Sequence, residues 1–228
     1  MNEPVKTRRR YRSSLRQQRA RANREAVLAA ARRRFLADGY PRTTVASIAE
    51  EAGVSEDLVY LLFKNKRRLL VEVLNFAVTG EVDSPRVLEQ AGPQAVRAET
   101  DQRRQLAMFA HDIAHRVDRA RPVDDVMRSA ALVDEAVANQ YQAMHATRLE
   151  NLRQFIGWVA ANGPLRDGVT LDEAAATTWT LAAPDTHRML LDGLGWSLDS
   201  YADWLHRTLQ AVLLPPDASS TTTRPQHQ

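Results

Sequence analysis

Residues 44–63 have the sequence TVASIAEEAGVSEDLVYLLF, and no other segment constrains the architecture of this chain as tightly. Thr44 supplies a side-chain oxygen that can cap a short helix over residues 45–52, whose apolar residues recur at the i, i+3, i+4, i+7 spacing of one helical face. Gly53 ends this helix, and Ser55 caps a second helix that fills the rest of the segment. Two short helices joined by a turn that contains glycine are the sequence form of a helix-turn-helix.

The second short helix has one face suited to packing and another suited to contact with a partner. Val59 and Phe63 lie four residues apart and are expected to face inward. The outward positions lie among Glu56, Asp57, Leu58, Leu61 and Leu62. A helix that enters the major groove of DNA must expose its first turn to the base edges while its inner face packs against neighbouring helices. Backbone N–H groups at its start, and at the Thr44 cap, can face phosphate, which the helix dipole favours.

Helices are also predicted on both sides of this segment. One runs from about Arg21 to Asp38 and ends at Gly39, because glycine readily adopts the left-handed conformation at a helix end and Pro41 cannot continue a helix. Another follows the second short helix and carries leucines and valines toward Gly80. The pattern predicts a helix-turn-helix DNA-binding domain over residues 21–66.

The remainder, residues 67–214, is predicted to form a helical body, since no segment alternates β-branched or aromatic residues with polar ones as a strand does. Residues 81–99 contain two prolines and a glycine and predict a loop or a broken helix. The pattern then predicts a helix over about residues 101–119, a shorter one opened by Pro122, and a long one that reaches about Asn162.

The end of the body carries clear helix signals. Thr170 and Glu173 match a capping box of the Thr-x-x-Glu type. The helix that begins there meets Pro184, which predicts a kink. A last helix is predicted over residues 198–213, and the Ser/Thr/Gln-rich residues 215–228 are expected to be disordered. The predicted fold class is all-α, with an N-terminal three-helix DNA-binding domain and a C-terminal helical bundle.

Positive charge is concentrated at one end of the chain, although the net charge is only +3. Residues 1–40 carry twelve Lys and Arg against three acidic residues, a balance of +9, so the remainder carries −6. Such a segment favours a polyanionic partner, because each phosphate neutralised by Lys or Arg releases condensed counterions. A solubilising tail explains the charge alone equally well.

Residues 1–20 are predicted to form a basic, flexible arm, because almost no apolar side chain is present there to pack in a core. The basic residues in and next to the arm are Lys6, Arg8, Arg9, Arg10, Arg12, Arg16, Arg19 and Arg21. An arm of this kind can reach an adjacent minor groove. Its deletion is expected to weaken DNA binding and to flatten the salt dependence of the affinity.

Caps, glycines and apolar positions coincide in one register at Val27, Ala30, Ala31, Phe35, Gly39, Tyr40, Thr44, Ile48, Ala49, Ala52, Gly53, Val54, Ser55, Val59, Tyr60, Phe63, Lys66, Leu69 and Leu70. In this set the chain resembles the helix-turn-helix of the TetR (tetracycline-repressor) family of transcriptional regulators. The resemblance implies a sequence-specific regulator, expected to be a ligand-responsive homodimeric repressor that binds a palindromic double-stranded DNA operator. It also implies that Tyr60 and Lys66 contact the DNA backbone. Glu56, Asp57, Leu58, Leu61 and Leu62 then read or border the bases.

The chain departs from the family pattern in three places, at the pair Glu56 and Asp57, at Leu62 and at Arg34, and Leu62 replaces a frequent His or Tyr. Glu56 and Asp57 are acidic where relatives often carry a basic, small or neutral polar residue. These carboxylates either accept a hydrogen bond from the cytosine amino group or simply favour the helix N-terminus through its dipole. Leu58 or Leu61 can meet a thymine methyl group. Arg34 stands where an apolar residue is usual, which predicts a less buried turn of the first helix.

For the body, the resemblance implies a homodimer interface on the last two long helices, about residues 171–191 and 198–213, whose apolar stripes agree with that role. An ordinary internal helix pair is the alternative. The family also implies a cavity for an unknown small-molecule effector. Candidate lining residues are Phe109, Met127, Tyr141, Met144, Trp158, Trp179 and His187. Most residues of these types in a helical body belong to the core.

Several other classes of protein are disfavoured. The chain has no cysteine, which excludes thiol catalysis and fits a reducing cytosol. Its longest apolar run, Leu58–Phe63, is far short of the roughly 20 residues that a membrane span needs. His111 and His115 lie four residues apart, but no third ligand is evident, so a polar or pocket-lining role is preferred to metal binding. No cofactor is predicted.

No phosphate-binding loop, metalloprotease motif or nucleophile elbow is present in the sequence. We therefore expect a cytoplasmic regulator without enzymatic activity. The alternative is a helical small-molecule or lipid binding protein with a degenerate DNA-binding head, an alternative encouraged by the two acidic residues on the second short helix.

Overall fold

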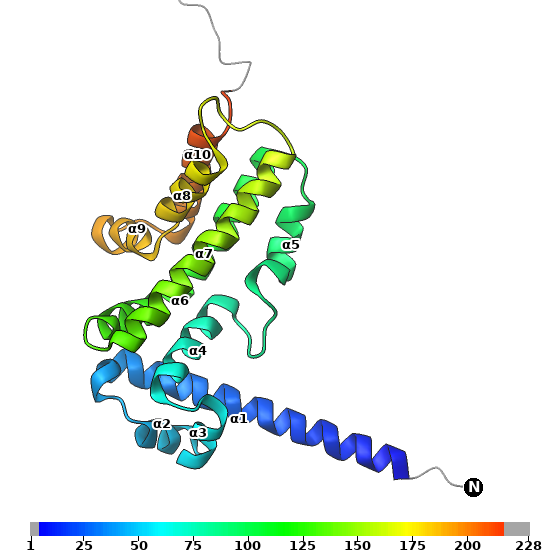
Figure 1. Cartoon of the computed structure of the whole chain (residues 1–228), viewed down its shortest axis with the longest axis vertical. Helices are drawn as coiled ribbons and strands as arrows, with labels where there is room; N and C mark the ends of the chain where they lie inside the picture. The colour runs from blue at the N-terminus through cyan, green and yellow to red at the C-terminus, as the bar shows by residue number, and fades with distance from the viewer. Residues whose placement is uncertain (1–4, 217–228) are drawn as a thin grey trace, which may run out of the picture. The chain divides into compact units, whose positions relative to one another are not determined.

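The computed structural model describes residues 5–216, with side chains from residue 16 onward, and every regular element in that range is helical (Figure 1). The first elements are α1 (Val5–Arg42), α2 (Val45–Ala52), α3 (Glu56–Phe63), α4 (Lys66–Thr79) and the 3₁₀ turn η1 (Val87–Glu89). They are followed by α5 (Ala91–Ala98), α6 (Gln102–Ala131), α7 (Glu135–Ala161), α8 (Leu171–Leu181), α9 (Pro184–Arg188), the π-helical turn η2 (Met189–Gly193) and α10 (Leu198–Leu213). The all-α fold class is confirmed. Residues 217–228, which hold most of the tail predicted to be disordered, lie outside the described range.

The chain divides into two compact units. The first comprises residues 1–85 and 119–143, and the second comprises residues 86–118 and 144–228. Each of the long helices α6 and α7 has one end in the first unit and the other end in the second unit. These two units are defined by which residues contact one another. The predicted domain boundary at residue 66 instead separates a DNA-binding part from a regulatory part, and it stays a prediction. Within residues 5–216, no helix combines the length and the apolar character that crossing a membrane requires.

The first unit is built on packing of α1 against α2 and α4. Val27 and Phe35 on α1, Ile48 on α2 and Leu70 on α4 are all completely buried. These residues lie on the apolar faces that the helical spacing predicts. Burying side chains of this size contributes roughly 1.5–3 kcal/mol each, which fixes short helices that would be unstable alone.

The second unit has its own core, formed by α5, α6, α7, α8 and α10. Its largest completely buried side chains include Tyr201, Leu205 and Leu209 on α10 and Ile156 on α7. The capping box at the start of α8 is confirmed, because Thr170 Oγ1 accepts from the Glu173 N–H at 3.2 Å and Glu173 Oε2 accepts from the Thr170 N–H at 2.9 Å.

Three helix boundaries differ from the predictions. Helix α1 begins at Val5 rather than at about Arg21, so the segment predicted as a flexible arm is helical from that residue on. Its Arg, Gln and Ala residues favour a helix by their intrinsic propensity. Helix α6 continues through Pro122 instead of restarting there. Val117, Val123 and Met127 around this proline are buried, and their packing offsets the cost of about 3 kcal/mol.

The third difference concerns Pro184. The sequence predicts one kinked helix over residues 171–191, but α8 ends at Leu181 and Pro184 becomes the first residue of α9. Proline suits this position because the first N–H of a helix has no partner within the helix. The segment predicted as a loop or broken helix, residues 81–99, does contain the short elements η1 and α5.

Candidate nucleic-acid interface

Helix α3 is held by a cap at its start and by two buried side chains on its inner face. Ser55 Oγ accepts a hydrogen bond from the Leu58 N–H at 3.3 Å. Val59 and Phe63 are 2% and 1% exposed, as their spacing predicts. Gly53 ends α2 with a φ of 67°, a left-handed conformation that glycine adopts without strain. The turn and the inner face therefore fix the direction in which α3 presents its other side.

The outer face of α3 carries four exposed side chains. Glu56, Asp57, Tyr60 and Leu61 are exposed, and Tyr60 and Leu61 have 47% and 79% of their surface accessible. These positions form one continuous face, since residues three and four apart are neighbours on a helix. Leu58 and Leu62, which the sequence analysis places with them, are half-buried. Of the five positions predicted to read or border the bases, Glu56, Asp57 and Leu61 are exposed, whereas Leu58 and Leu62 are partly covered. Their contact with bases stays a prediction.

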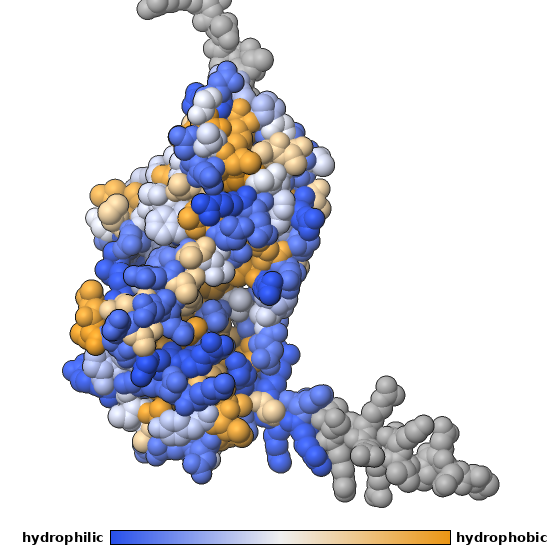
Figure 2. Space-filling view, viewed as in Figure 1, coloured by the Kyte–Doolittle hydropathy of each residue, from blue (hydrophilic) through white to orange (hydrophobic). Residues whose placement is uncertain are grey.

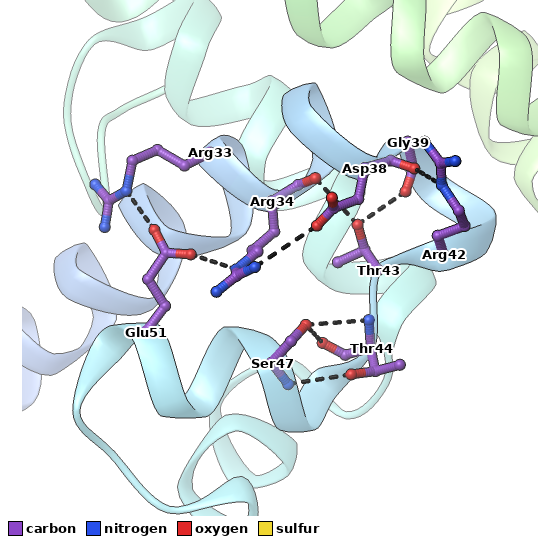
Figure 3. A network of polar contacts seen from close by, with 9 residues as sticks. All are labelled: Arg33, Arg34, Asp38, Gly39, Arg42, Thr43, Thr44, Ser47 and Glu51. Carbon is purple, nitrogen blue, oxygen red and sulfur yellow. Dashed lines mark hydrogen bonds and ion pairs between the residues drawn. The ribbon is translucent and has the colours of Figure 1, made fainter.

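Thr44 caps α2 as predicted, and Ser47 completes the cap (Figure 3). Thr44 Oγ1 accepts from the Ser47 N–H at 3.1 Å, and Ser47 Oγ accepts from the Thr44 N–H at 3.3 Å. The capping box uses serine at the position where Glu or Gln is more usual. Thr44 is exposed, so its cap lies at the surface where a phosphate contact is predicted.

A charged network joins α1 to α2, and Figure 3 shows it around Glu51. The Nε atoms of Arg33 and Arg34 each lie 2.5 Å from a carboxylate oxygen of Glu51, and Arg34 also lies 3.8 Å from Asp38. The hydrogen bond from Arg33 is the main cause of a lowered Glu51 pKa. Arg34, which departs from the family pattern, therefore exchanges an apolar contact for an ion pair, and its side chain stays 37% exposed.

The turn between α1 and α2 is closed by Thr43. This residue is 1% exposed, and its hydroxyl donates to the Gly39 carbonyl at 2.8 Å (Figure 3). Gly39 has non-helical angles, φ 73° and ψ 166°, which end the regular part of α1 where the sequence predicts. The Arg42 Nε donates to the Asp38 carbonyl at 2.8 Å. These bonds satisfy carbonyls that the end of a helix would otherwise leave unpaired.

Lys66, predicted to contact the DNA backbone, has internal partners in this structure. Its Nζ donates to the carbonyls of Tyr40 and Thr43, both at 2.9 Å, and lies 4.3 Å from the centre of the Tyr40 ring. Burial lowers the pKa of Lys66. An ammonium group has three donors, so one remains for another acceptor. The sequence identifies the residue but not its role in holding α4 against the end of α1.

Asp134 is a residue of this region that the sequence analysis misses. Its Oδ1 accepts from the N–H groups of Ala136 and Val137 at 3.1 and 3.3 Å, which caps α7. Its Oδ2 accepts from the Tyr40 hydroxyl at 3.3 Å and lies 3.5 Å from Arg67 Nε. Burial and the Asp134 carboxylate raise the pKa of Tyr40 to about 12. A cap before residue 135 could be suspected from the sequence, but not its contact with a residue 94 positions away.

A hollow of about 470 Å³ lies beside the junction of α3 and α4 in the same unit. Four of its lining residues are basic, namely Arg24, Lys64, Arg67 and Arg68, and one is acidic, Glu72. Arg24 and Arg68 both pair with Glu72, at 3.1 and 3.0 Å. The guanidinium of Arg24 also lies 4.9 Å from the centre of the Phe63 ring. Arg24 therefore joins α1 to α4, whereas Arg68 pairs with Glu72 within α4.

The predicted effector residues fall into both units. Met127, buried, and Tyr141, whose hydroxyl donates to Asp124 at 3.2 Å, belong to the first unit. Phe109, Met144, Trp158, Trp179 and His187 belong to the second. Phe109 stacks on Phe155 with ring centres 4.0 Å apart. An effector role for this set stays a prediction.

Within the second unit, two of these residues meet polar partners. Buried His187 lies 3.3 Å from an Asp118 carboxylate oxygen and edge-on to the Tyr201 ring. The Arg148 guanidinium lies 5.5 Å from the Trp179 ring centre. The rings of the predicted pair His111 and His115 are 4.6 Å apart, and the described residues include no group of three or more potential metal ligands.

Residues 27–73 match the family model of bacterial regulatory proteins, tetR family. This range holds α2, α3 and the packing faces of α1 and α4, and it confirms the resemblance predicted for residues 27–70. None of the curated proteins matches the chain in sequence.

Solved structures match over most of the chain. A putative TetR-family transcriptional regulator from Rhodococcus sp. is 20% identical with a TM-score of 0.63, and the match covers 84% of this chain and 98% of that one. NalD, the secondary repressor of the MexAB-OprM multidrug efflux pump in Pseudomonas aeruginosa, is 22% identical with a TM-score of 0.61, over 84% and 96%. A complex of SmeT with triclosan is 19% identical with a TM-score of 0.63, over 91% and 100%. SmeT represses the Stenotrophomonas maltophilia efflux pump SmeDEF. At these identities the likeness shows the fold.

Proposed function

We propose, on the premise that the N-terminal domain of this chain belongs to the tetR family of bacterial regulatory proteins, that the protein is a ligand-responsive repressor that binds a palindromic DNA operator as a homodimer. The observation that carries the proposal is the accessible outer face of α3 on a helix whose inner face is locked by Val59 and Phe63. A rigid helix with one free face is what insertion into the major groove requires.

Phosphate contacts are proposed at the edges of this face. Thr44 and Ser55 are exposed N-cap residues, and the N-termini of the helices that they cap carry partial positive charge. Tyr60 is exposed beside them, and Lys66 keeps one donor for a phosphate. These contacts would set the register of α3 on the duplex without selecting a sequence.

The proposed dimer uses the surface around α8 and η2 together with α10. Leu171, Met189 and Leu194 are 52%, 62% and 66% exposed, although large apolar side chains are usually covered. Most of the face drawn in Figure 2 is hydrophilic and its apolar patches are separate from one another. The α8 and α10 helices also contact each other inside the chain, as the alternative of an internal pair requires. A dimer would have to use the remaining outer faces of the same helices.

An effector is proposed because a structurally similar regulator, SmeT, has been solved with triclosan. In this chain the aromatic and histidine side chains of the second unit offer the matching chemistry. Trp179, His187 and Phe109 combine apolar rings with one titratable group, a composition typical of sites for small aromatic molecules.

Two measurements test the proposal. In a gel shift with DNA that flanks its own gene, the protein should give a saturable, salt-sensitive shift with a palindromic footprint. Light scattering at micromolar concentration should give the mass of a dimer. A helical carrier of small molecules or lipids with a degenerate DNA-binding head would give no specific shift, and a monomer would exclude the two-half-site mode.

A further inference from the structure

Helix α3 has an unusual set of side chains for a helix that reads DNA. From Glu56 to Phe63 it contains no Lys, Arg, Asn, Gln, Ser or Thr, and the Tyr60 hydroxyl is its only side-chain hydrogen-bond donor. The nearest other donors, Ser55 and Lys64, flank the helix, and the Ser55 oxygen caps it. Guanine is usually recognised by Arg or Lys donating to O6 and N7, and adenine by Asn or Gln. Helix α3 has none of these four residue types.

Apart from the Tyr60 hydroxyl, which is proposed above to meet phosphate, the outer face offers apolar contact and hydrogen-bond acceptance. Leu61 is 79% exposed, while its neighbours Leu58 and Leu62 are half-buried. The inner residues Val59 and Phe63 fill the core, so Leu61 is not needed there. In the major groove the C5-methyl group of thymine is the one apolar feature that distinguishes a base pair. A leucine side chain on this face can bury its surface against that group.

We propose that Leu61 selects thymine in each half-site of the operator through its C5-methyl group, and that α3 makes no side-chain contact that selects guanine. The inference rests on the proposed function, since it concerns the same helix bound in the major groove. The sequence alone leaves both Leu58 and Leu61 as candidates for the contact with the thymine methyl group. The larger exposed surface of Leu61 favours Leu61. The acidic pair at the start of α3 is not needed for it.

The expected size of the effect follows from the area of one methyl group. Burying one methyl or methylene group is worth about a fourfold change in an equilibrium constant. A symmetric dimer has two such contacts, so removal of both methyl groups should weaken binding by roughly 15-fold. Removal of the leucine side chain should abolish this dependence, because no other side chain would contact the methyl group.

The test begins with selection of bound DNA from a random pool, which gives the half-site. The thymine most enriched in each half-site is then replaced by deoxyuridine, which lacks only the methyl group. Fluorescence anisotropy measures the affinity of the wild-type protein and of Leu61→Ala for both duplexes. Leu132→Ala serves as the matched control, since Leu132 is an 85% exposed leucine on the α6–α7 turn in the same unit. Both substitutions are at the surface, so both variants should fold.

The wild-type protein and Leu132→Ala are expected to bind the thymine duplex about 15-fold more tightly than the uracil duplex. Leu61→Ala should bind both duplexes equally. The inference is overturned if the wild-type protein does not distinguish them, if Leu61→Ala still does, or if no thymine is enriched. A pool without any enriched motif would overturn the proposed function as well, whereas a palindrome without methyl dependence would refute only the role of Leu61.

Discussion

Asp134 offers the clearest test of how the helix-turn-helix is held. Its carboxylate caps α7 and accepts the Tyr40 hydroxyl from the end of α1, so two elements far apart in sequence depend on one side chain. Replacement by alanine removes both interactions. Replacement by asparagine keeps a good N-cap but removes the negative charge that Tyr40 and Arg67 face.

The expected loss of stability is the sum of the separate interactions that Asp134 makes. Loss of an N-cap costs about 1 kcal/mol, and loss of a hydrogen bond to a charged group costs roughly 1.5 kcal/mol. The ion pair with Arg67 adds little, because the Arg67 side chain is 52% exposed and its partner lies 3.5 Å away. Asp134→Ala should therefore lower the free energy of unfolding by roughly 2–3 kcal/mol, and Asp134→Asn by about 1 kcal/mol. In a chain of this size each kcal/mol lowers the melting temperature by about 2–4 °C.

Thermal and urea unfolding of both variants provide the measurement, with Asp172→Asn as the control. Asp172 pairs with Arg153 at 2.8 Å but is 79% exposed and caps no helix, so its replacement should change stability by less than about 0.5 kcal/mol. A Tyr40→Phe change combined with each variant isolates the hydroxyl contact. If Asp134→Asn proves as damaging as Asp134→Ala, the cap contributes nothing. If neither variant differs from wild type, the reasoning is refuted.

Three further outcomes are expected. The pKa of Tyr40 is raised from its usual 10 to about 12, so its stabilising contribution is complete below pH 10 and is lost as the pH rises from 10 to 12. In unfolding measured against pH, Tyr40→Phe should therefore lose less stability than the wild-type protein between pH 10 and 12. An identical loss in both proteins would exclude Tyr40 as its source. Lys66→Ala should lower stability by about 2 kcal/mol without DNA, because two carbonyls would then lack a donor, whereas a residue that only contacts phosphate would leave unfolding unchanged. Deletion of residues 1–20 should reduce the slope of log affinity against log salt by about 0.9 for each phosphate that this segment neutralises, and an unchanged slope would remove the segment from the interface.

The sequence predicts the helix-turn-helix well because its signals are local. Caps such as Thr44 and Ser55, the left-handed Gly53, and apolar residues three and four apart each act within one turn of helix. They determine α2 and α3 to the residue. Helix boundaries that depend on a few neighbouring residues can therefore be predicted without a structure.

Prolines show where local signals fail. Pro122 sits inside α6 and Pro184 begins α9, although both are equally strong breakers when read from the sequence. What distinguishes them is packing: Val123 and Met127, just after Pro122, are completely buried, so the tertiary structure retains the helix there. Burial of this kind depends on elements remote in sequence.

Polar contacts between distant residues are equally hidden. Lys66 matches a family position, which predicts a contact with DNA, but its bonds to the carbonyls of Tyr40 and Thr43 depend on how the end of α1 turns. The pairing of Arg34 with Glu51 likewise requires α1 and α2 to be packed first. Residue identity indicates that a charge is available, and only the fold determines which partner it meets.

These contacts converge on one short segment, the turn from Gly39 to Thr43. Lys66 binds its carbonyls from α4, and Asp134 binds the Tyr40 hydroxyl from the start of α7. Movement of the α6–α7 turn away from α1 must therefore break the Tyr40 contact, at the same net cost of roughly 1.5 kcal/mol. That energy corresponds to about 13-fold in an equilibrium, within the roughly 1–3 kcal/mol usual for coupling between sites. A change in the operator affinity of Tyr40→Phe far above about 13-fold would mean that the turn acts on α3 through some other contact.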